Sequence, residues 1–169
     1  ITDTVPIVVD ISDKLSVFSS QAKKREDYYT KCKYLQHFYY TQNGKTLSKQ
    51  FRVSTGAFGF SNTEDSGSTG TGLMKISNKF KAPKKYQVLV GKKPINLVLG
   101  PDMVGTRKDP QTGDVHDADV LTGILELVGL EPCNKNIYSR SIYVHGTNKE
   151  KSLGGKHSNG CIRVSNENI

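Results

Sequence analysis

One thiol and one imidazole near the end of the sequence have the residue types and spacing for chemistry. His145 is followed by a glycine, and Cys161 comes sixteen residues later, directly after Gly160. A thiolate is strongly nucleophilic, and a nearby imidazole takes the thiol proton or, as imidazolium, depresses the thiol pKa. Gly160 permits a sharp turn, so the backbone N–H groups of residues 159–161 can converge as an oxyanion hole. The pattern predicts nucleophilic acyl transfer, with Cys161 as nucleophile and His145 as base.

Arg163 stands two residues after Cys161. In a strand this spacing places both side chains on the same side. A guanidinium there either stabilises the thiolate or binds a substrate carboxylate, and the sequence leaves both alternatives open. A cysteine and a histidine alone are weak evidence, because most unpaired cysteines are buried small apolar residues. The context of the pair therefore matters more than the pair itself.

Short apolar and aromatic segments between turn-forming residues predict a chain made mostly of β-strands. A strand at residues 142–144 would deliver His145 to the edge of a sheet. An opening hairpin is expected over residues 7–18, and a second around Asn43-Gly44, a dipeptide that suits a type I′ turn. Further strands are expected at residues 32–40, 47–54, 73–76, 86–90 and 95–99, with loops at 61–72 and 102–117.

Residues 120–128 predict a helix. Their apolar positions, at 120, 121, 124, 125, 127 and 128, fit one face of a helix. Asp119 is placed to cap the start, and Gly129 suits the left-handed residue that often follows a helix.

The composition is that of a folded domain with an ordinary polar surface. A length of 169 residues, with 35% hydrophobic and 24% charged residues, fits one domain with its own core. The net charge of +8 comes from scattered lysines and arginines, so we interpret it as a solvated surface rather than a nucleic-acid site. No apolar run of about eighteen residues is present, so no segment is expected to span a membrane.

Other candidate sites have simpler explanations. His116 lies among three aspartates at 114, 117 and 119, but these acids more simply serve as caps for the predicted helix. The glycine-rich residues 67–72 lack the Gly-Lys-Ser/Thr ending of a phosphate-binding loop. Three cysteines cannot all pair within one chain, and they lack the CxxC spacing of a zinc site. No metal or cofactor is expected, and whether Cys32 and Cys133 form a disulfide stays open.

The residues around the pair resemble the signature of the L,D-transpeptidase family, bacterial cysteine enzymes that act on peptidoglycan stem peptides. The family pattern is a strand ending in His-Gly, a loop, and then Ser/Thr-His-Gly-Cys with an apolar residue and Arg or Asn. This chain has Val144-His145-Gly146-Thr147 and Ser158-Asn159-Gly160-Cys161-Ile162-Arg163. Weaker similarities at residues 8–18, 53–56, 69–76 and 122–134 extend the resemblance over nearly the whole chain.

The resemblance implies a role for each matching residue. Cys161 is the nucleophile and His145 the general base, and the carbonyl of Gly146 holds the other imidazole nitrogen, as an Asp does in serine proteases. The remaining motif positions are implied to form the oxyanion hole or to shape the site and contact substrate: Gly160, Asn159, Ser158 and Arg163. The implied fold is mainly β, with two mixed sheets packed as a sandwich and one or two short helices. A single domain over residues 1–169 is expected, with the C-terminal strand of the family missing.

The implied reaction is attack on the bond after the diaminopimelate of a tetrapeptide stem, with release of D-Ala. The acceptor is a second stem or the lysine of a lipoprotein, whereas transfer to water would make the protein an L,D-carboxypeptidase. The implied location is the periplasm of a Gram-negative cell envelope, reached by export with a signal peptide that the sequence does not contain. The implied partners are peptidoglycan stems, without nucleic acid.

The sequence departs from the family pattern at three positions. Asn159 stands where the family has His, and Asn keeps a donor and an acceptor but does not titrate. A catalytically weakened peptidoglycan-binding homologue is therefore a further alternative. His157, which lies next to the motif, is a candidate to replace the missing His. Gly70 replaces a Pro, and Gly123 replaces an Arg of the predicted helix. A papain-like protease has its Cys before its His, the reverse of the order here.

Overall fold

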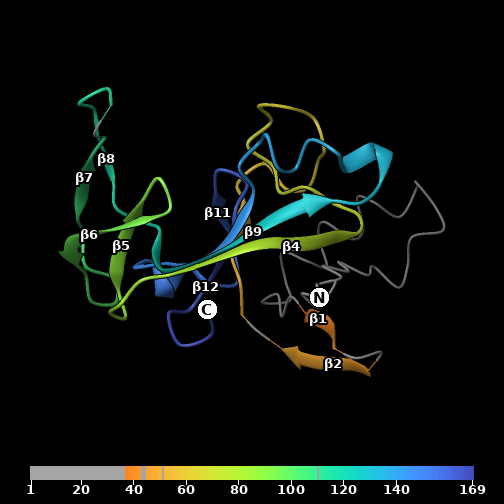
Figure 1. Ribbon diagram of the computed structural model, residues 1–169, viewed down its shortest axis with the longest axis horizontal. Helices are drawn as coiled ribbons and strands as arrows, with labels where there is room; N and C mark the ends of the chain where they lie inside the picture. The colour runs from red at the N-terminus through yellow and green to blue at the C-terminus, as the bar shows by residue number, and fades with distance from the viewer. Residues whose placement is uncertain (1–36, 43–44, 51, 110) are drawn as a thin grey trace.

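The computed structural model describes residues 37–42, 45–50, 52–109 and 111–169, and these form a mainly β structure with mixed sheets, as predicted (Figure 1). The strands are β1 (His37–Gln42), β2 (Lys45–Gln50), β3 (Thr55–Gly56), β4 (Met74–Lys81), β5 (Gln87–Val90), β6 (Lys93–Val98), β7 (Thr106–Lys108), β8 (Val115–Asp117), β9 (Leu121–Gly129), β10 (Tyr143–Gly146), β11 (Lys156–Ser158) and β12 (Ile162–Val164). Two 3₁₀ turns, η2 (Pro132–Asn134) and η3 (Glu150–Ser152), are the helical segments of these residues. The predicted opening hairpin and Cys32 lie outside the described residues.

A six-stranded mixed sheet forms the centre of the fold. Its order is β12-β10-β9-β5-β6, and β4 also pairs with β9. The pairing of β10 with β12 is parallel, and the other pairings of this sheet are antiparallel. In Figure 1, β4 and β9 lie side by side along most of their length. Because a parallel pair needs a crossover connection, residues 147–161 leave the sheet after β10 and return beside it at β12.

The predicted helix over residues 120–128 is wrong, because this segment is the central strand β9 (Leu121–Gly129). Asp119 is therefore not a helix cap, and Gly123 lies in a strand. Strands on both sides and side chains on both faces bury six of the nine residues of β9 and leave the other three half-buried. A strand buried on both faces has a continuous apolar sequence, and its periodicity is then the same as that of a buried helix.

Smaller sheets surround the central one. β1 and β2 form an antiparallel hairpin, and its connection at residues 43–44 lies outside the described residues. β7 and β8 form a second hairpin, at the end of the molecule that β5 and β6 occupy in Figure 1. The predicted loop at residues 102–117 is therefore wrong where it contains these two strands. Both carry mostly exposed polar side chains and lack the apolar alternation by which a strand is predicted. β3 pairs with β11 in parallel.

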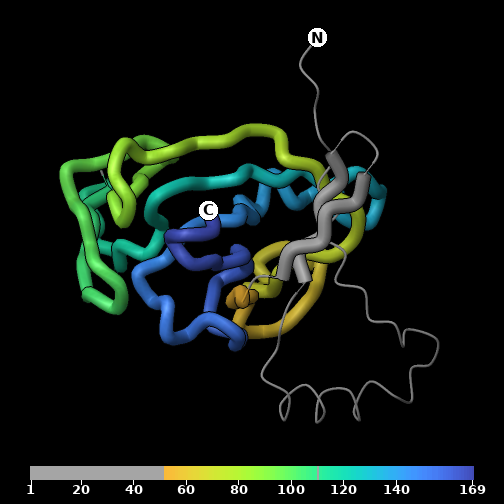
Figure 2. The backbone as a smooth tube through the Cα atoms, turned by 90° about the horizontal axis from the view of Figure 1, so that it is seen from below, coloured from red at the N-terminus to blue at the C-terminus, as the bar shows by residue number. Residues whose placement is uncertain are grey.

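The main core cluster lies beneath the strands that carry the motif. Val144 of β10 and Ile162 and Val164 of β12 are buried in it, together with Met74 and Leu127. Each such side chain contributes about 1.5–3 kcal/mol when fully buried. Figure 2 shows the end of the chain in the middle of the outline. Two backbone hydrogen bonds between Ser54 and Arg163, at 2.8 and 2.9 Å, join β12 to the segment that follows residue 52.

Candidate active site

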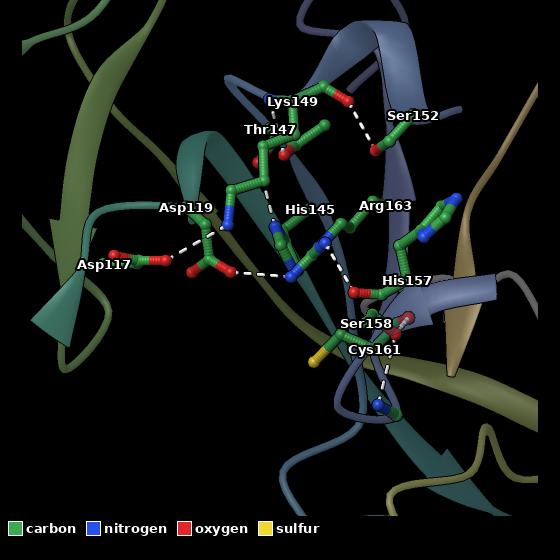
Figure 3. Close-up of polar contacts among 12 residues, drawn as sticks. Asp117, Asp119, His145, Thr147, Lys149, Ser152, His157, Ser158, Cys161 and Arg163 are labelled. Atoms are coloured by element: carbon green, nitrogen blue, oxygen red, sulfur yellow. Dashed lines mark hydrogen bonds and ion pairs between the residues drawn. The ribbon is translucent and has the colours of Figure 1, made fainter. Parts of the chain in front are cut away.

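The register of β10 and β12 brings the predicted site residues onto one face of the sheet. Val144 pairs with Ile162, and His145 pairs with Arg163. Val144 and Ile162 point into the core, and successive side chains of a strand alternate between faces. His145, Arg163 and Cys161, which directly precedes β12, therefore share the opposite face, where Figure 3 shows them close together.

His145 is held in one orientation by its own backbone. Its side chain is 2% exposed, and Nδ1 lies 2.9 Å from the Gly146 carbonyl oxygen. Because a carbonyl only accepts, Nδ1 carries the proton and Nε2 keeps a lone pair for a base. Burial lowers the pKa of His145, Gly146 and Asp119 oppose this effect, and Arg163 adds to it. The imidazole is therefore neutral at pH 7.

The half-buried Cys161 thiol is bonded to the backbone leading into β10. Sγ donates to the Ser141 carbonyl oxygen at 3.4 Å and accepts from the Tyr143 N–H at 3.5 Å. Among the described residues, no hydrogen bond joins Sγ to the imidazole. Burial raises the pKa of Cys161 to about 11, although the Tyr143 N–H and Arg163 act in the opposite direction. The resting pair is thus a neutral thiol and a neutral imidazole.

The turn before Cys161 is closed by the Ser158 hydroxyl. Oγ donates to the Cys161 carbonyl oxygen at 2.5 Å and accepts from the Gly160 N–H at 3.1 Å. Gly160 has φ +120°, and a Cβ there would lie 2.7 Å from Ile142 Cδ1. The sharp turn that the sequence predicts is confirmed. The Gly160 N–H, expected in an oxyanion hole, is bonded to Ser158 in this structure.

Thr69 fastens this turn to the rest of the fold. Its buried hydroxyl donates to the Gly160 carbonyl oxygen at 2.8 Å and accepts from the Gly56 N–H at 2.8 Å. Thr69 is not among the site residues predicted from the sequence. In the sequence, Thr69 is an ordinary threonine of a glycine-rich loop. Nothing local indicates its partner, which lies 91 residues later.

Arg163 forms an ion pair with Asp119, which is also not among the site residues predicted from the sequence. One guanidinium nitrogen donates to Asp119 Oδ2 at 2.7 Å, and another donates to the His157 carbonyl oxygen at 3.0 Å. Arg163 is 6% exposed, and its buried Nε has no hydrogen-bond partner among the residues that the structure describes. Figure 3 shows this ion pair beside His145. In the sequence, Asp119 is an acid directly before an apolar run. This pattern is also typical of a helix cap, and it does not indicate an ion pair with Arg163.

Replacing Asp119 with Asn is expected to destabilise the fold and to make the thiol more reactive. The nearly buried guanidinium loses its counter-ion, which costs about 2–4 kcal/mol of unfolding free energy, as measured by urea denaturation. Because the Asp119 charge raises the pKa of Cys161, its removal accelerates alkylation of Cys161 at a fixed pH. Asp117→Asn is the matched control, since its pair with Lys149 is exposed and is expected to be worth about 0.5 kcal/mol. Equal stability of both variants would contradict the structural role of Asp119.

Asn159 is exposed and lines a pocket of about 350 Å³ beside the turn that precedes Cys161. The other lining residues are Glu64, Asp65, Ser66, Gly67, Ser139, Arg140 and Ile142. Figure 3 shows the His157 ring turned away from the Cys161 sulfur. His157 therefore does not take the place of the missing motif histidine in this arrangement.

The remaining candidates lie apart from this face. His116 is exposed on β8, and no group of three or more potential metal ligands occurs in the described ranges. Cys133 is exposed in η2. None of the helical segments described here is long and apolar enough to cross a membrane.

Comparison with known protein families agrees with this geometry. The family model for the L,D-transpeptidase catalytic domain (YkuD) matches residues 7–169. No curated protein matched the chain. The family match covers the strands, the turn and all of the site residues described above.

Proposed function

Because the chain belongs to the L,D-transpeptidase catalytic domain family, we propose that it is a peptidoglycan L,D-transpeptidase. Cys161 is the nucleophile, and the substrate is a tetrapeptide stem that is cleaved between diaminopimelate and D-Ala. The observation that carries this proposal is the common face of Cys161, His145 and Arg163, with the Gly146 carbonyl fixing the imidazole tautomer. The protein would act outside the cytoplasmic membrane, in the periplasm, after export.

The two neutral groups define the first chemical step. The thiol exchanges its Ser141 hydrogen bond for one to His145 Nε2, which takes the proton as Sγ attacks the scissile carbonyl carbon. The imidazolium then gives this proton to the departing amine. D-Ala is released, and the rest of the stem stays bound to Cys161 as a thioester. An acceptor amine attacks the thioester carbon and gives a proton to His145, and the bond to Sγ breaks as the new amide forms. The imidazolium then returns this proton to the Cys161 thiolate, which restores the neutral pair. Water in place of the amine gives the carboxypeptidase reaction.

Arg163 acts in this scheme on charge rather than as a substrate ligand. Its guanidinium is buried and bonded to Asp119, so it does not reach into solvent for a carboxylate. A fixed cation near Sγ favours the thiolate that develops during attack. The oxyanion is proposed to accept hydrogen bonds from backbone N–H groups at the turn. The Gly160 N–H would first exchange its hydrogen bond to Ser158 for one to the oxyanion.

The pocket beside Asn159 supports binding of a peptide stem next to the thiol. Ile142, the residue before Tyr143, forms part of its wall, so the pocket adjoins the segment bonded to Sγ. Its lining includes the acids Glu64 and Asp65 and the basic residue Arg140, whose guanidinium donates to the carbonyl oxygens of Ser61 and Ser68. A stem peptide with both ammonium and carboxylate groups complements such a wall. Asn159 is proposed to contact the stem through its amide.

The proposed reaction predicts D-Ala release when the protein is incubated with a disaccharide tetrapeptide, as followed by mass spectrometry. Added amine acceptors, either a second stem or a lipoprotein lysine peptide, should convert the product from a tripeptide to a cross-linked or coupled species. A carbapenem, an inhibitor typical of the family, should acylate Cys161. Absence of both D-Ala release and acylation would instead support the alternative of a weakened peptidoglycan-binding homologue. Tripeptide alone, whatever the acceptor, would identify an L,D-carboxypeptidase.

A further inference from the structure

The face of the central sheet that carries His145, Cys161 and Arg163 is called the catalytic face. A row of side chains crosses this face, away from the motif. Tyr143 of β10 pairs with Glu126 of β9, and Glu126 pairs with Asn78 of β4. The Tyr143 N–H donates to Cys161 Sγ, so the thiol stands at the end of this row. Paired residues of neighbouring strands point to the same face. Whatever fixes Glu126 and Tyr143 therefore acts on the neighbourhood of the thiol.

Lys92 lies on this row with its ammonium in an aromatic cage. Nζ forms an ion pair with Glu126 Oε1 and lies 5.6, 5.7 and 5.5 Å from the ring centroids of Phe80, Tyr138 and Tyr143, respectively. These distances are within the range of cation–π attraction. The cage thus joins Lys92 electrostatically both to a carboxylate and to the tyrosine next to Cys161.

Glu126 is a buried charge that the proposed reaction does not use. It is 1% exposed, and its second carboxylate oxygen accepts from Asn78 Nδ2 at 2.6 Å and Ser77 Oγ at 3.3 Å. Burial alone would raise the pKa of Glu126, but the bonds to Asn78, Lys92 and Ser77 outweigh it and lower the pKa. A buried carboxylate with this set of partners is a fixed anchor for the ammonium.

The turn that carries Lys92 has the backbone of a two-residue hairpin loop. Gly91 and Lys92 connect β5 to β6, with φ +52° and φ +65°. A two-residue loop of type I′ needs a positive φ at both central residues, and a lysine adopts this conformation at a cost that glycine avoids. The Glu126 carboxylate and the three rings add contacts at the end of the Lys92 side chain.

We propose that Lys92 is a positioning residue for Cys161. Its caged ammonium, anchored on Glu126, holds Tyr143 in place, and the Tyr143 N–H holds the thiol sulfur. The inference rests on the proposed role of Cys161 as nucleophile, but its test does not require the transpeptidase reaction. It assigns to the β5–β6 turn, which is remote from the motif in sequence, a role in setting thiol reactivity.

The test follows alkylation of Cys161 by iodoacetamide as a function of pH, with peptide mass spectrometry to separate Cys161 from the other cysteines. The Tyr143 N–H lowers the pKa of Cys161, so loosening Tyr143 raises this pKa and slows alkylation at a fixed pH. Lys92→Met and Glu126→Gln are each expected to slow it by about three- to tenfold, which corresponds to about 0.5–1 pKa unit. Tyr138→Leu, at an exposed ring, should give a smaller change of the same sign. Lys92→Arg should restore most of the rate.

The signs of these effects distinguish positioning from simple electrostatics. Removing a cation and removing an anion near a thiol shift its pKa in opposite directions, whereas loss of positioning slows both variants. Lys93→Met is the matched control, because Lys93 is the neighbouring lysine at the start of β6, where it is exposed and outside the cage. Each variant is assayed well below its melting temperature. Opposite signs for Lys92→Met and Glu126→Gln, or a lower melting temperature with unchanged Cys161 alkylation, would overturn the proposal.

The proposed function and the positioning role of Lys92 are tested by separate measurements. In the wild-type protein, D-Ala release reports on the reaction, whereas the alkylation series reports on positioning alone. If the wild type releases no D-Ala but the series behaves as expected, the function fails and the positioning stands. If the wild type is active, Lys92→Met should lower kcat about three- to tenfold with KM unchanged, and Lys92→Arg should restore kcat. An unchanged kcat in Lys92→Met would contradict positioning.

Discussion

Replacing Cys161 with Ala is expected to abolish acyl transfer and to leave the fold intact. Without Sγ no thioester forms, so D-Ala release should fall by about 10⁴-fold or more, and carbapenem should no longer add to the protein. Within the described part of the chain, the side chain makes two long hydrogen bonds, at 3.4 and 3.5 Å. Its loss should therefore change the free energy of unfolding by no more than about 1 kcal/mol. Mass spectrometry of the released D-Ala and urea denaturation measure the two effects.

Cys133→Ala is the matched control for this experiment. Cys133 is exposed in η2, away from the strands and the turn that carry His145 and Cys161. This variant should keep the wild-type rate and should still be acylated once, at Cys161. If Cys161→Ala kept more than about 1% of the rate, a different nucleophile would be required. If it unfolded at a much lower urea concentration, loss of activity alone would not identify the nucleophile.

The central part of the site is predictable from the sequence because it is local. The residues from Ser158 to Arg163 form one turn and one strand, and Gly160 reveals that turn through its need for positive φ. His145 ends a short strand, and its bond to the Gly146 carbonyl involves adjacent residues. Such contacts follow from short spacings along the chain. The catalytic roles of these residues remain a prediction until the variants are measured.

Contacts between distant segments could not be predicted in this way. Asp119 reaches Arg163 across 44 residues, Thr69 reaches Gly160 across 91, and Lys92 reaches Glu126 across 34. Each depends on the sheet order, which places β9 at the centre. The misassigned helix concealed that order, because a helix at residues 120–128 provides no strand between β10 and β4. Once β9 is a strand, the register aligns Glu126 with Tyr143.

The pKa shifts of the two central groups act together. Burial lowers the pKa of His145 and raises that of Cys161 to about 11. Below the lowered His145 pKa the imidazole is protonated and cannot act as a base. Above it, up to a pH of about 11, both groups are neutral. A pre-formed thiolate–imidazolium pair needs the opposite order of pKa values, so this geometry favours proton transfer during attack.

Replacing His145 with Gln should therefore change the pH dependence as well as the rate. In the wild-type protein, kcat/KM should rise through the lowered His145 pKa, below 6.5, and then stay level across neutral pH. In His145→Gln the base is absent, and only thiol that has already ionised reacts. With a pKa of about 11, about one thiol in 10⁴ is ionised at pH 7. The variant rate should then rise tenfold per pH unit until the pKa of the thiol is approached.

The expected loss in His145→Gln at pH 7 is about 10²–10⁴-fold in kcat/KM, and it should shrink steadily towards high pH. Gln keeps a polar side chain of similar length but cannot carry a proton. His157→Gln is the matched control, because that exposed ring points away from the sulfur, and its profile should match the wild type. If His145→Gln lost activity equally at every pH, His145 would act on structure rather than as the base. If the wild-type rate itself rose tenfold per unit above pH 7, the reacting form would be the free thiolate, and the neutral pair would not be the catalytic state.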